Sequence, residues 1–316
     1  MLPATLQMRP MTPDDAAGWA ALLAVCEEAD GRGEHYDVED CAEELAEPGL
    51  DLTADTWFVL DDDHPVGYQI LHLRPGAQRW ALSEAAVHPA HRGRGVGSAL
   101  LARAREWAAQ RGAGFVLQVP ETQVDAVELA VGAGLTAVRW WSELRRDLAR
   151  PVVPAALPDG LTVAPLGPPY EAARWDEPLR AAHNAAFAGH WGSSPVPADT
   201  WAHLRGGNRN FRPACSAAAL TGAGAVAGYL LAYEFDADTA RTGVRDLYVA
   251  TVGTVDEWRG RGVAGALLAH VLTVAAADGF GRSSLTVDTQ NPTGALGVYD
   301  RAGYVVHRRE VSYTDA

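Results

Sequence analysis

Lysine is absent from the 316-residue sequence, and all 26 cationic side chains are arginine. This absence excludes any motif built around a lysine, such as the GxxxxGKS/T phosphate loop. Positive charge is also scarce relative to negative charge, because 40 acidic residues leave a formal net charge of −14. Binding to nucleic acid requires a basic face that displaces counterions from the phosphates. Because this chain is strongly acidic, we expect no nucleic-acid partner. A cationic small substrate is compatible with this charge.

Cysteine is scarce as well, occurring at Cys26, Cys41 and Cys215. An odd number without a CxxC pair predicts reduced intracellular thiols and no disulfide framework. No set of His, Asp and Glu has a recognisable ligand spacing, so we expect no metal. The sequence also lacks a run of eighteen apolar residues and an amino-terminal secretory pattern. We therefore expect no membrane contact and a cytoplasmic location.

An internal repeat organises the rest of the sequence. Three short segments occur twice in the same order. The pairs are 66–68 with 227–229, the Arg/Gly loops 92–97 with 259–264, and 133–135 with 302–304. Three markers in one order indicate two copies of one unit. We predict the copies at 1–150 and 159–316, joined by a proline-rich extended linker at 151–158.

Hydrophobic periodicity predicts the same order of elements in both copies. The expected elements are helices at 13–29 and 172–187, strands at 56–60, 67–71 and 228–235, an amphipathic helix after each Arg/Gly loop, and strands at 115–119 and 284–287. This order predicts an α+β class in a three-layer arrangement, with two tandem folds. Each fold should contain a mixed, mostly antiparallel sheet flanked by helices.

Each Arg/Gly loop lies between a predicted strand and a predicted helix. Glycines let backbone N–H groups approach a ligand, and the following helix presents free N–H groups and its positive dipole end. Arginine adds charge-assisted hydrogen bonds, so the loops favour a pyrophosphate. The dinucleotide pattern GxGxxG does not fit, because residues 95–100 lack its third glycine. A glycine-rich turn with solvated arginines is the alternative.

The loops resemble the R/Q-x-x-G-x-G/A coenzyme-A-binding motif of the GNAT N-acetyltransferases. Residues 291–304 resemble that family's Asn-x-x-Ala…Tyr-x-x-x-Gly-Phe/Tyr segment. The resemblance covers nearly the whole chain, and its tandem form is similar to the mycothiol synthases. It implies acetyl-CoA, or another acyl-CoA, as co-substrate and a small-molecule amine as acceptor. A monomer and a homodimer both remain open.

The resemblance also implies which residues contact the coenzyme. In the second copy they are Val252, Gly253, Thr254, Val255, Arg259, Gly260, Arg261, Gly262, Val263, Ala264, Gly265 and Asn291. In the first copy they are Ala86, Val87, His88, Arg92, Gly93, Arg94, Gly95, Val96 and Gly97.

Acyl transfer from a thioester to an amine needs a neutral amine, a polarised carbonyl and a proton for the leaving thiolate. The resemblance implies that Tyr299 supplies this proton and that backbone N–H groups at 252–255 polarise the carbonyl. Asn291 is expected to cap the last helix, with Pro292 at its first position.

The resemblance implies a glutamate as general base at the position of Tyr248, so the base must be another group in this chain. Asp246 and Glu234 are the candidates, and a chain of water molecules is the alternative. Substrate contacts are expected at His183, Asn184, His190, Trp191 and Tyr248.

The first copy differs at the catalytic position, where Ala130 replaces Tyr299. Alanine cannot protonate a thiolate, although the intact first loop could still hold a coenzyme. Two function classes follow: an N-acyltransferase acting through the second copy, and a catalytically silent acyl-CoA sensor or interaction module. A mycothiol synthase proper and a peptide acetyltransferase are further enzyme alternatives.

Overall fold

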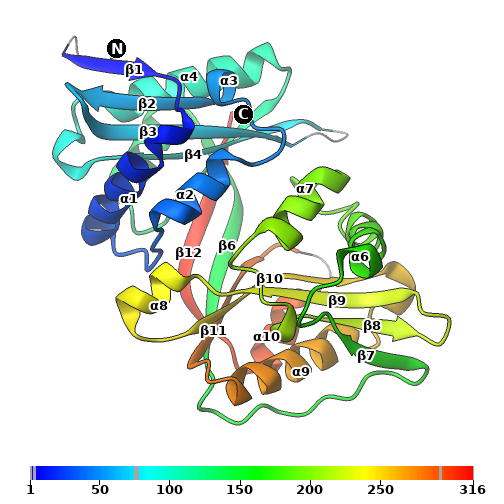
Figure 1. Cartoon of the computed structure of the whole chain (residues 1–316). Helices are drawn as coiled ribbons and strands as arrows, with labels where there is room; N and C mark the ends of the chain where they lie inside the picture. Colours follow the sequence, from blue (N-terminus) through cyan, green and yellow to red (C-terminus); the bar gives the residue numbers. More distant parts are fainter. Residues whose placement is uncertain (1, 3–4, 75–77, 292–293, 316) are drawn as a thin grey trace. The chain divides into compact units, whose positions relative to one another are not determined.

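The computed structural model describes residues 2, 5–74, 78–291 and 294–315. The chain forms two compact units (Figure 1). The first comprises Met1–Trp140 and Glu310–Ala316, and the second comprises Trp141–Arg309. No helix in the described ranges combines the length and apolar content that a membrane crossing requires.

The first unit contains one sheet in the order β1-β2-β3-β4-β5. All its neighbours pair antiparallel except β4 and β5, which are parallel. Its elements are β1 (Leu6–Arg9), η1 (Pro13–Asp15), α1 (Ala16–Asp30), α2 (Val38–Leu45), α3 (Leu52–Asp55), β2 (Thr56–Asp61), β3 (His64–Arg74), β4 (Trp80–Val87), η2 (Pro89–His91), α4 (Val96–Gln110), β5 (Gly114–Pro120), α5 (Val124–Gly132) and the start of β6 (Thr136–Asp147).

The second unit repeats this plan in the order β11-β10-β9-β8-β7, and β10 and β11 are its parallel pair. Its elements are β7 (Leu161–Pro165), α6 (Ala172–Ala186), α7 (Ala198–Ala202), the π-helix η3 (His203–Gly207), η4 (Pro213–Cys215), β8 (Ala217–Thr221), β9 (Val226–Tyr233), α8 (Asp236–Thr242), β10 (Asp246–Thr254), η5 (Asp256–Trp258), α9 (Val263–Ala277), β11 (Arg282–Asp288), α10 (Ala295–Arg301) and most of β12 (Val305–Thr314).

The central strands are buried on both faces because each sheet carries helices on both sides. In the first unit, α4 covers one face of the sheet, and α1 and α2 cover the other (Figure 1). Val59 and Leu71 pack in the cluster that contains α4, whereas Phe58, Leu60 and Ile70 pack in the cluster that contains α1 and α2. Successive side chains of a strand point to opposite faces, so both parities must be apolar. This explains why these strands have nearly continuous hydrophobic sequences.

The second unit has the same layers. Leu230 and Ala232 of β9 pack with α9, and the intervening Tyr229, Leu231 and Tyr233 pack with α6. The structure therefore confirms the predicted α+β class with two tandem three-layer folds and mostly antiparallel sheets.

The copies exchange their last strands, which the sequence repeat does not predict. The end of β6, Trp141–Asp147, pairs antiparallel with β11 in the second unit. The end of β12, Glu310–Thr314, pairs antiparallel with β5 in the first unit. The compact units therefore differ from the copies predicted at 1–150 and 159–316, because each sheet is completed by a strand from the other copy.

Candidate functional site

The second unit opens between its two parallel strands. β10 pairs with β11 only at residues 246–248, opposite residues 282–284. Beyond this point β10 follows β9 alone, with a register shift between Val249 and Thr251 that leaves Ala250 as an extra residue. A bulge of this kind bends a strand and increases its twist. The result is a split at the carboxyl ends of β10 and β11.

Backbone donors of β10 face this split. The N–H of Val255 donates to the carbonyl oxygen of Ala227 at 3.1 Å, on the β9 side. Because N–H directions alternate along an antiparallel strand, the N–H groups of Val252 and Thr254 point away from β9. These donors belong to the segment predicted to polarise a carbonyl.

The second Arg/Gly loop follows β10 directly and leads into α9. Gly260 and Gly262 have φ of +71° and +87°, in the region that L side chains rarely adopt. The corresponding Gly93 and Gly95 of the first loop have φ of +72° and +87°. Both loops therefore have the same conformation, and both present the free N–H groups of a helix start to an anion.

The first arginine of each loop anchors the loop within the protein. Arg259 donates from Nη2 to the carbonyl oxygen of Ala186 at 2.5 Å and from Nε to that of Thr254 at 3.2 Å. Arg92 makes a bidentate ion pair with Asp30 at 2.6 and 2.8 Å. The contact of these two arginines with a pyrophosphate stays a prediction. The second arginines of the loops, Arg94 and Arg261, are exposed.

Tyr299 lies on α10, which packs with residues of β10 and β11 in one apolar cluster. Burial, and then the neighbouring Tyr248, raise the pKa of Tyr299 to about 12, so it carries its proton at neutral pH. Its hydroxyl makes no hydrogen bond within the described part of the chain. A protonated hydroxyl without a hydrogen-bond partner among the described residues has the properties of a general acid.

Helix α10 does not begin at the residue that the sequence predicts. Gly294 occupies the N-cap position of α10 and Ala295 is its first residue, so the expected capping role of Asn291 is wrong. Pro292, expected at the first helical position, lies outside the described residues. Asn291 instead approaches His190, with Nδ2 at 3.2 Å from Nε2. Two residues 101 positions apart, one expected to bind coenzyme and one substrate, thus meet.

The remaining substrate-side residues have varied surroundings. Asn184 accepts a hydrogen bond at 2.8 Å from the backbone N–H of Val196, so its amide holds the segment that follows α6. The indole ring of Trp191 lies 6.3 Å from that of Trp141. Tyr248 is half-buried, with its ring 6.2 Å from Phe235.

His183 takes part in a support beneath β10 that the sequence analysis missed. Its Nδ1 lies 2.7 Å from the hydroxyl of the fully buried Tyr229. A Cβ at Gly253 would lie 2.4 Å from Cε1 of Tyr229, so this ring fills the space beneath the two backbone donors. Burial, then the nearby Arg205, lower the pKa of His183 to about 4, so the imidazole is neutral. The repeated Gly-Tyr pair at 228–229 was the available signal.

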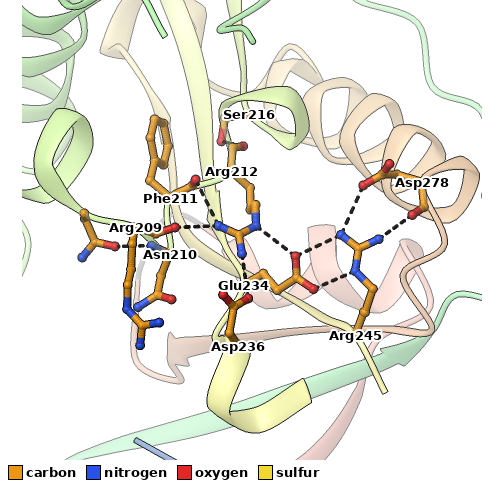
Figure 2. A network of polar contacts seen from close by, with 10 residues as sticks. Arg209, Asn210, Phe211, Arg212, Ser216, Glu234, Asp236, Arg245 and Asp278 are labelled. Atoms are coloured by element: carbon orange, nitrogen blue, oxygen red, sulfur yellow. Dashed lines mark hydrogen bonds and ion pairs between the residues drawn. The ribbon is translucent and has the colours of Figure 1, made fainter. Parts of the chain in front are cut away.

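The two candidate bases differ in how far they are neutralised. Both oxygens of Glu234 accept hydrogen bonds from Arg212 and Arg245, at 2.7 to 2.9 Å (Figure 2). Burial opposes the charge, but the arginine contacts outweigh it and keep the pKa of Glu234 below its usual value. Asp246 accepts from Arg282 at 2.6 Å through Oδ2, while its buried Oδ1 finds no partner among the described residues. Asp246 is the better candidate.

The first unit has the loop but lacks other parts of the site. Its parallel strands also separate, after Ser83 and Leu117. However, β4 pairs with β3 without a register shift, so the counterpart of the Ala250 bulge is missing. Ala130, which replaces Tyr299 in the sequence, is fully buried on α5.

The chain resembles known proteins along most of its length. A family model described as the acetyltransferase (GNAT) family matches residues 18–133 and 177–304. The mycothiol acetyltransferase of Tsukamurella paurometabola is 32% identical over 309 residues, covering 95% of this chain and 96% of that protein. The mycothiol acetyltransferase of Streptomyces coelicolor is 29% identical, with 96% and 92% covered.

Solved structures match over the same extent. A GCN5-related N-acetyltransferase from Sphaerobacter thermophilus has a TM-score of 0.73 at 26% identity, covering 99% of this chain and 96% of that one. A tandem GNAT protein from the clavulanic acid biosynthesis pathway has a TM-score of 0.74 at 21% identity, covering 98% of both chains.

Proposed function

The chain is an acetyltransferase of the GNAT family, and we propose that it transfers an acyl group from acyl-CoA to a primary amine of a small molecule. Acetyl-CoA is the expected donor. The observation that carries the proposal is that the second unit combines an Arg/Gly loop, a bulged β10 that separates from β11, and a Tyr299 that packs in the same apolar cluster as residues of β10 and β11.

The residues of the second unit fit an acyl-CoA in three places. Free N–H groups at the start of α9, with Arg261 beside them, suit the pyrophosphate. The donors on Val252 and Thr254 suit the amide and carbonyl oxygens of the extended arm and its thioester. Gly260 and Gly262 leave open space where a Cβ would stand, so the backbone is accessible to the ligand.

The proposed reaction is direct attack. The amine nitrogen forms a bond to the thioester carbon while the Val252 and Thr254 donors stabilise the negative charge on its oxygen. The C–S bond then breaks, and the Tyr299 hydroxyl gives its proton to the departing thiolate. The proton lost from the amine passes through water to Asp246, and Tyr299 regains a proton from solvent.

The names of the mycothiol acetyltransferase relatives suggest a more specific candidate reaction. Two mycothiol acetyltransferases match more than nine-tenths of the chain. We therefore propose the mycothiol acetyltransferase activity as the first specific reaction to test, alongside the wider class of small amines.

The test is to incubate purified protein and acetyl-CoA with a panel of amines that includes the acceptor of the mycothiol acetyltransferases. Release of the coenzyme thiol is measured with a thiol reagent. Turnover that requires an amine and is lost in Tyr299→Phe supports the proposal. Acetyl-CoA binding without turnover on any amine would favour the silent sensor instead.

A further inference from the structure

A cluster in the first unit remains unassigned. It combines Glu44 of α2, His72 of β3 and Glu84 of β4. One potential ligand atom from each lies within 4.8 Å of the others. The three residues are far apart in the sequence, so their spacing does not predict a metal site. Only the fold brings them together.

The charges of this cluster are not balanced by arginine. Within the described residues, neither Glu44 nor Glu84 forms an ion pair with a guanidinium group. The closest polar contact to Glu84 is the Tyr68 hydroxyl, which donates to Oε1 at 3.3 Å. Arg32, which enters the same acidic region, pairs with Glu34 and Glu310.

Other carboxylates with little exposed side chain form ion pairs with arginine. Asp30 pairs with Arg92, Glu234 with Arg245 and Asp246 with Arg282. The side chain of Glu44 makes no hydrogen bond among the described residues, although it lies largely inside the unit. Glu44 therefore lacks the cation that these enclosed carboxylates have.

We propose that Glu44, His72 and Glu84 bind a divalent transition-metal ion, with Zn²⁺ the first to test. Imidazole nitrogen with carboxylate oxygens is a ligand set that suits zinc, whereas Mg²⁺ and Ca²⁺ prefer oxygen alone. Ligand atoms around tetrahedral zinc lie roughly 3.4 Å apart, so a small movement of the exposed Glu84 would complete the site. Glu47, whose Oε2 lies 3.6 Å from Nδ1 of His72, borders the ring as an outer-shell carboxylate.

Three protein ligands leave the fourth zinc position open to water or to an anionic ligand. The site lies wholly within the first unit, and none of its residues belongs to the acyl-transfer machinery proposed for the second. Its test is therefore independent of the proposed function.

The test is thermal unfolding of protein stripped of metal with EDTA, with and without ZnCl₂, MgCl₂ or putrescine. At a zinc concentration about a hundredfold above Kd, we expect the Tm of the wild type to rise by about 5 °C. Glu84→Gln and His72→Gln should lose this shift, with Kd at least about tenfold weaker. Glu39→Gln, an exposed position on the same helix α2, is the matched control and should respond as the wild type does.

The metal-free proteins provide a second and opposite readout. Glu84→Gln removes the repulsion between two carboxylates, so without metal its Tm should equal or exceed that of the wild type. With Zn²⁺ the order should reverse. The proposal is overturned if Zn²⁺ leaves the wild type unchanged, or if the wild type and Glu84→Gln shift equally. A shift with putrescine but not with Zn²⁺ would also overturn it and indicate a site for an organic cation.

Discussion

Tyr299 and Ala130 occupy corresponding places in the two copies but provide different chemistry. The tyrosine hydroxyl has a raised pKa and no hydrogen bond to any described residue, which suits an acid that must keep its proton until a thiolate leaves. The alanine side chain is buried and has no proton to give. The division of labour between the copies therefore begins with one side chain.

Replacing Tyr299 by phenylalanine should lower kcat by roughly 10²-fold, the scale of lost general-acid assistance. The KM for acetyl-CoA should change little, because the ring is retained and only the hydroxyl is lost. Steady-state kinetics on an accepted amine measure both quantities. Near-normal kcat would show that the thiolate leaves without help from Tyr299.

The pH dependence of kcat tests the same residue. Because burial and Tyr248 raise the pKa of Tyr299 to about 12, the acid form persists well above its ordinary pKa of 10 and is lost only as the pH approaches 12. We expect no decrease in kcat between pH 8 and 10 from this group. A decrease with an apparent pKa near 9, present in the wild type and absent in Tyr299→Phe, would contradict the assignment.

Glu234 forms ion pairs with two arginines, so its removal should affect the free energy of unfolding more than kcat. Glu234→Gln leaves Arg212 and Arg245 without their shared carboxylate, and we expect a loss of about 2 kcal/mol in the free energy of unfolding. The loss is limited because the side chains of Arg212 and Arg245 are 23% and 35% exposed and can be rehydrated. Denaturant unfolding measures it. A large drop in kcat in folded protein would instead restore Glu234 as a base.

The stability effect of Glu234 also has a defined pH dependence. Its folded-state pKa lies below the ordinary value of 4.5, so its stabilisation is fully present above that value and is lost as the pH falls through the folded pKa. The difference between wild type and Glu234→Gln should therefore be constant near pH 7 and shrink towards pH 3.

Among the elements, the two Arg/Gly loops have nearly identical backbones yet different surroundings. Gly95 and Gly262 share a φ of +87°, in the region that L side chains rarely adopt. A substitution therefore causes similar backbone strain at both positions. The same substitution at Gly95 and at Gly262 therefore compares the functions of the two loops.

We expect Gly262→Trp to eliminate turnover, because the indole ring would cover the N–H groups of the productive site. Gly95→Trp should change stability or coenzyme stoichiometry and leave the chemical step largely intact. Kinetics and coenzyme titration on variants shown to be folded by circular dichroism distinguish the two. Equal loss of turnover in both would refute the division of labour.

At the scale of the whole molecule, the sequence predicted the repeat, the layers and the loops, because these follow from local periodicity and glycine placement. It did not predict the exchange of final strands. β6 and β12 have no local feature that selects one sheet edge over the other, and the choice depends on partners far along the chain. The anchoring of Arg259 and the Tyr229–His183 support likewise depend on contacts between distant segments.

Ending the chain after Arg309 tests the exchange. The truncation removes Glu310–Thr314 from β5, including the buried side chains of Val311 and Tyr313, each worth roughly 1.5–3 kcal/mol. We expect faster amide exchange in β5 of the first unit, whereas β11, which pairs with β6, should remain protected. Ending the chain after Thr314 is the control. Equal loss of protection in β5 and β11 would contradict the division into these units.

The exchanged strand also sets the order in which the protein can be completed during synthesis. Translation at about 5–20 residues per second leaves roughly 10–35 s between the emergence of the first 140 residues and that of the strand at 310–314. During that interval the edge of β5 has no partner strand and is open to pairing with another chain. The half of the protein that is made first is therefore closed last, after the second copy has left the ribosome.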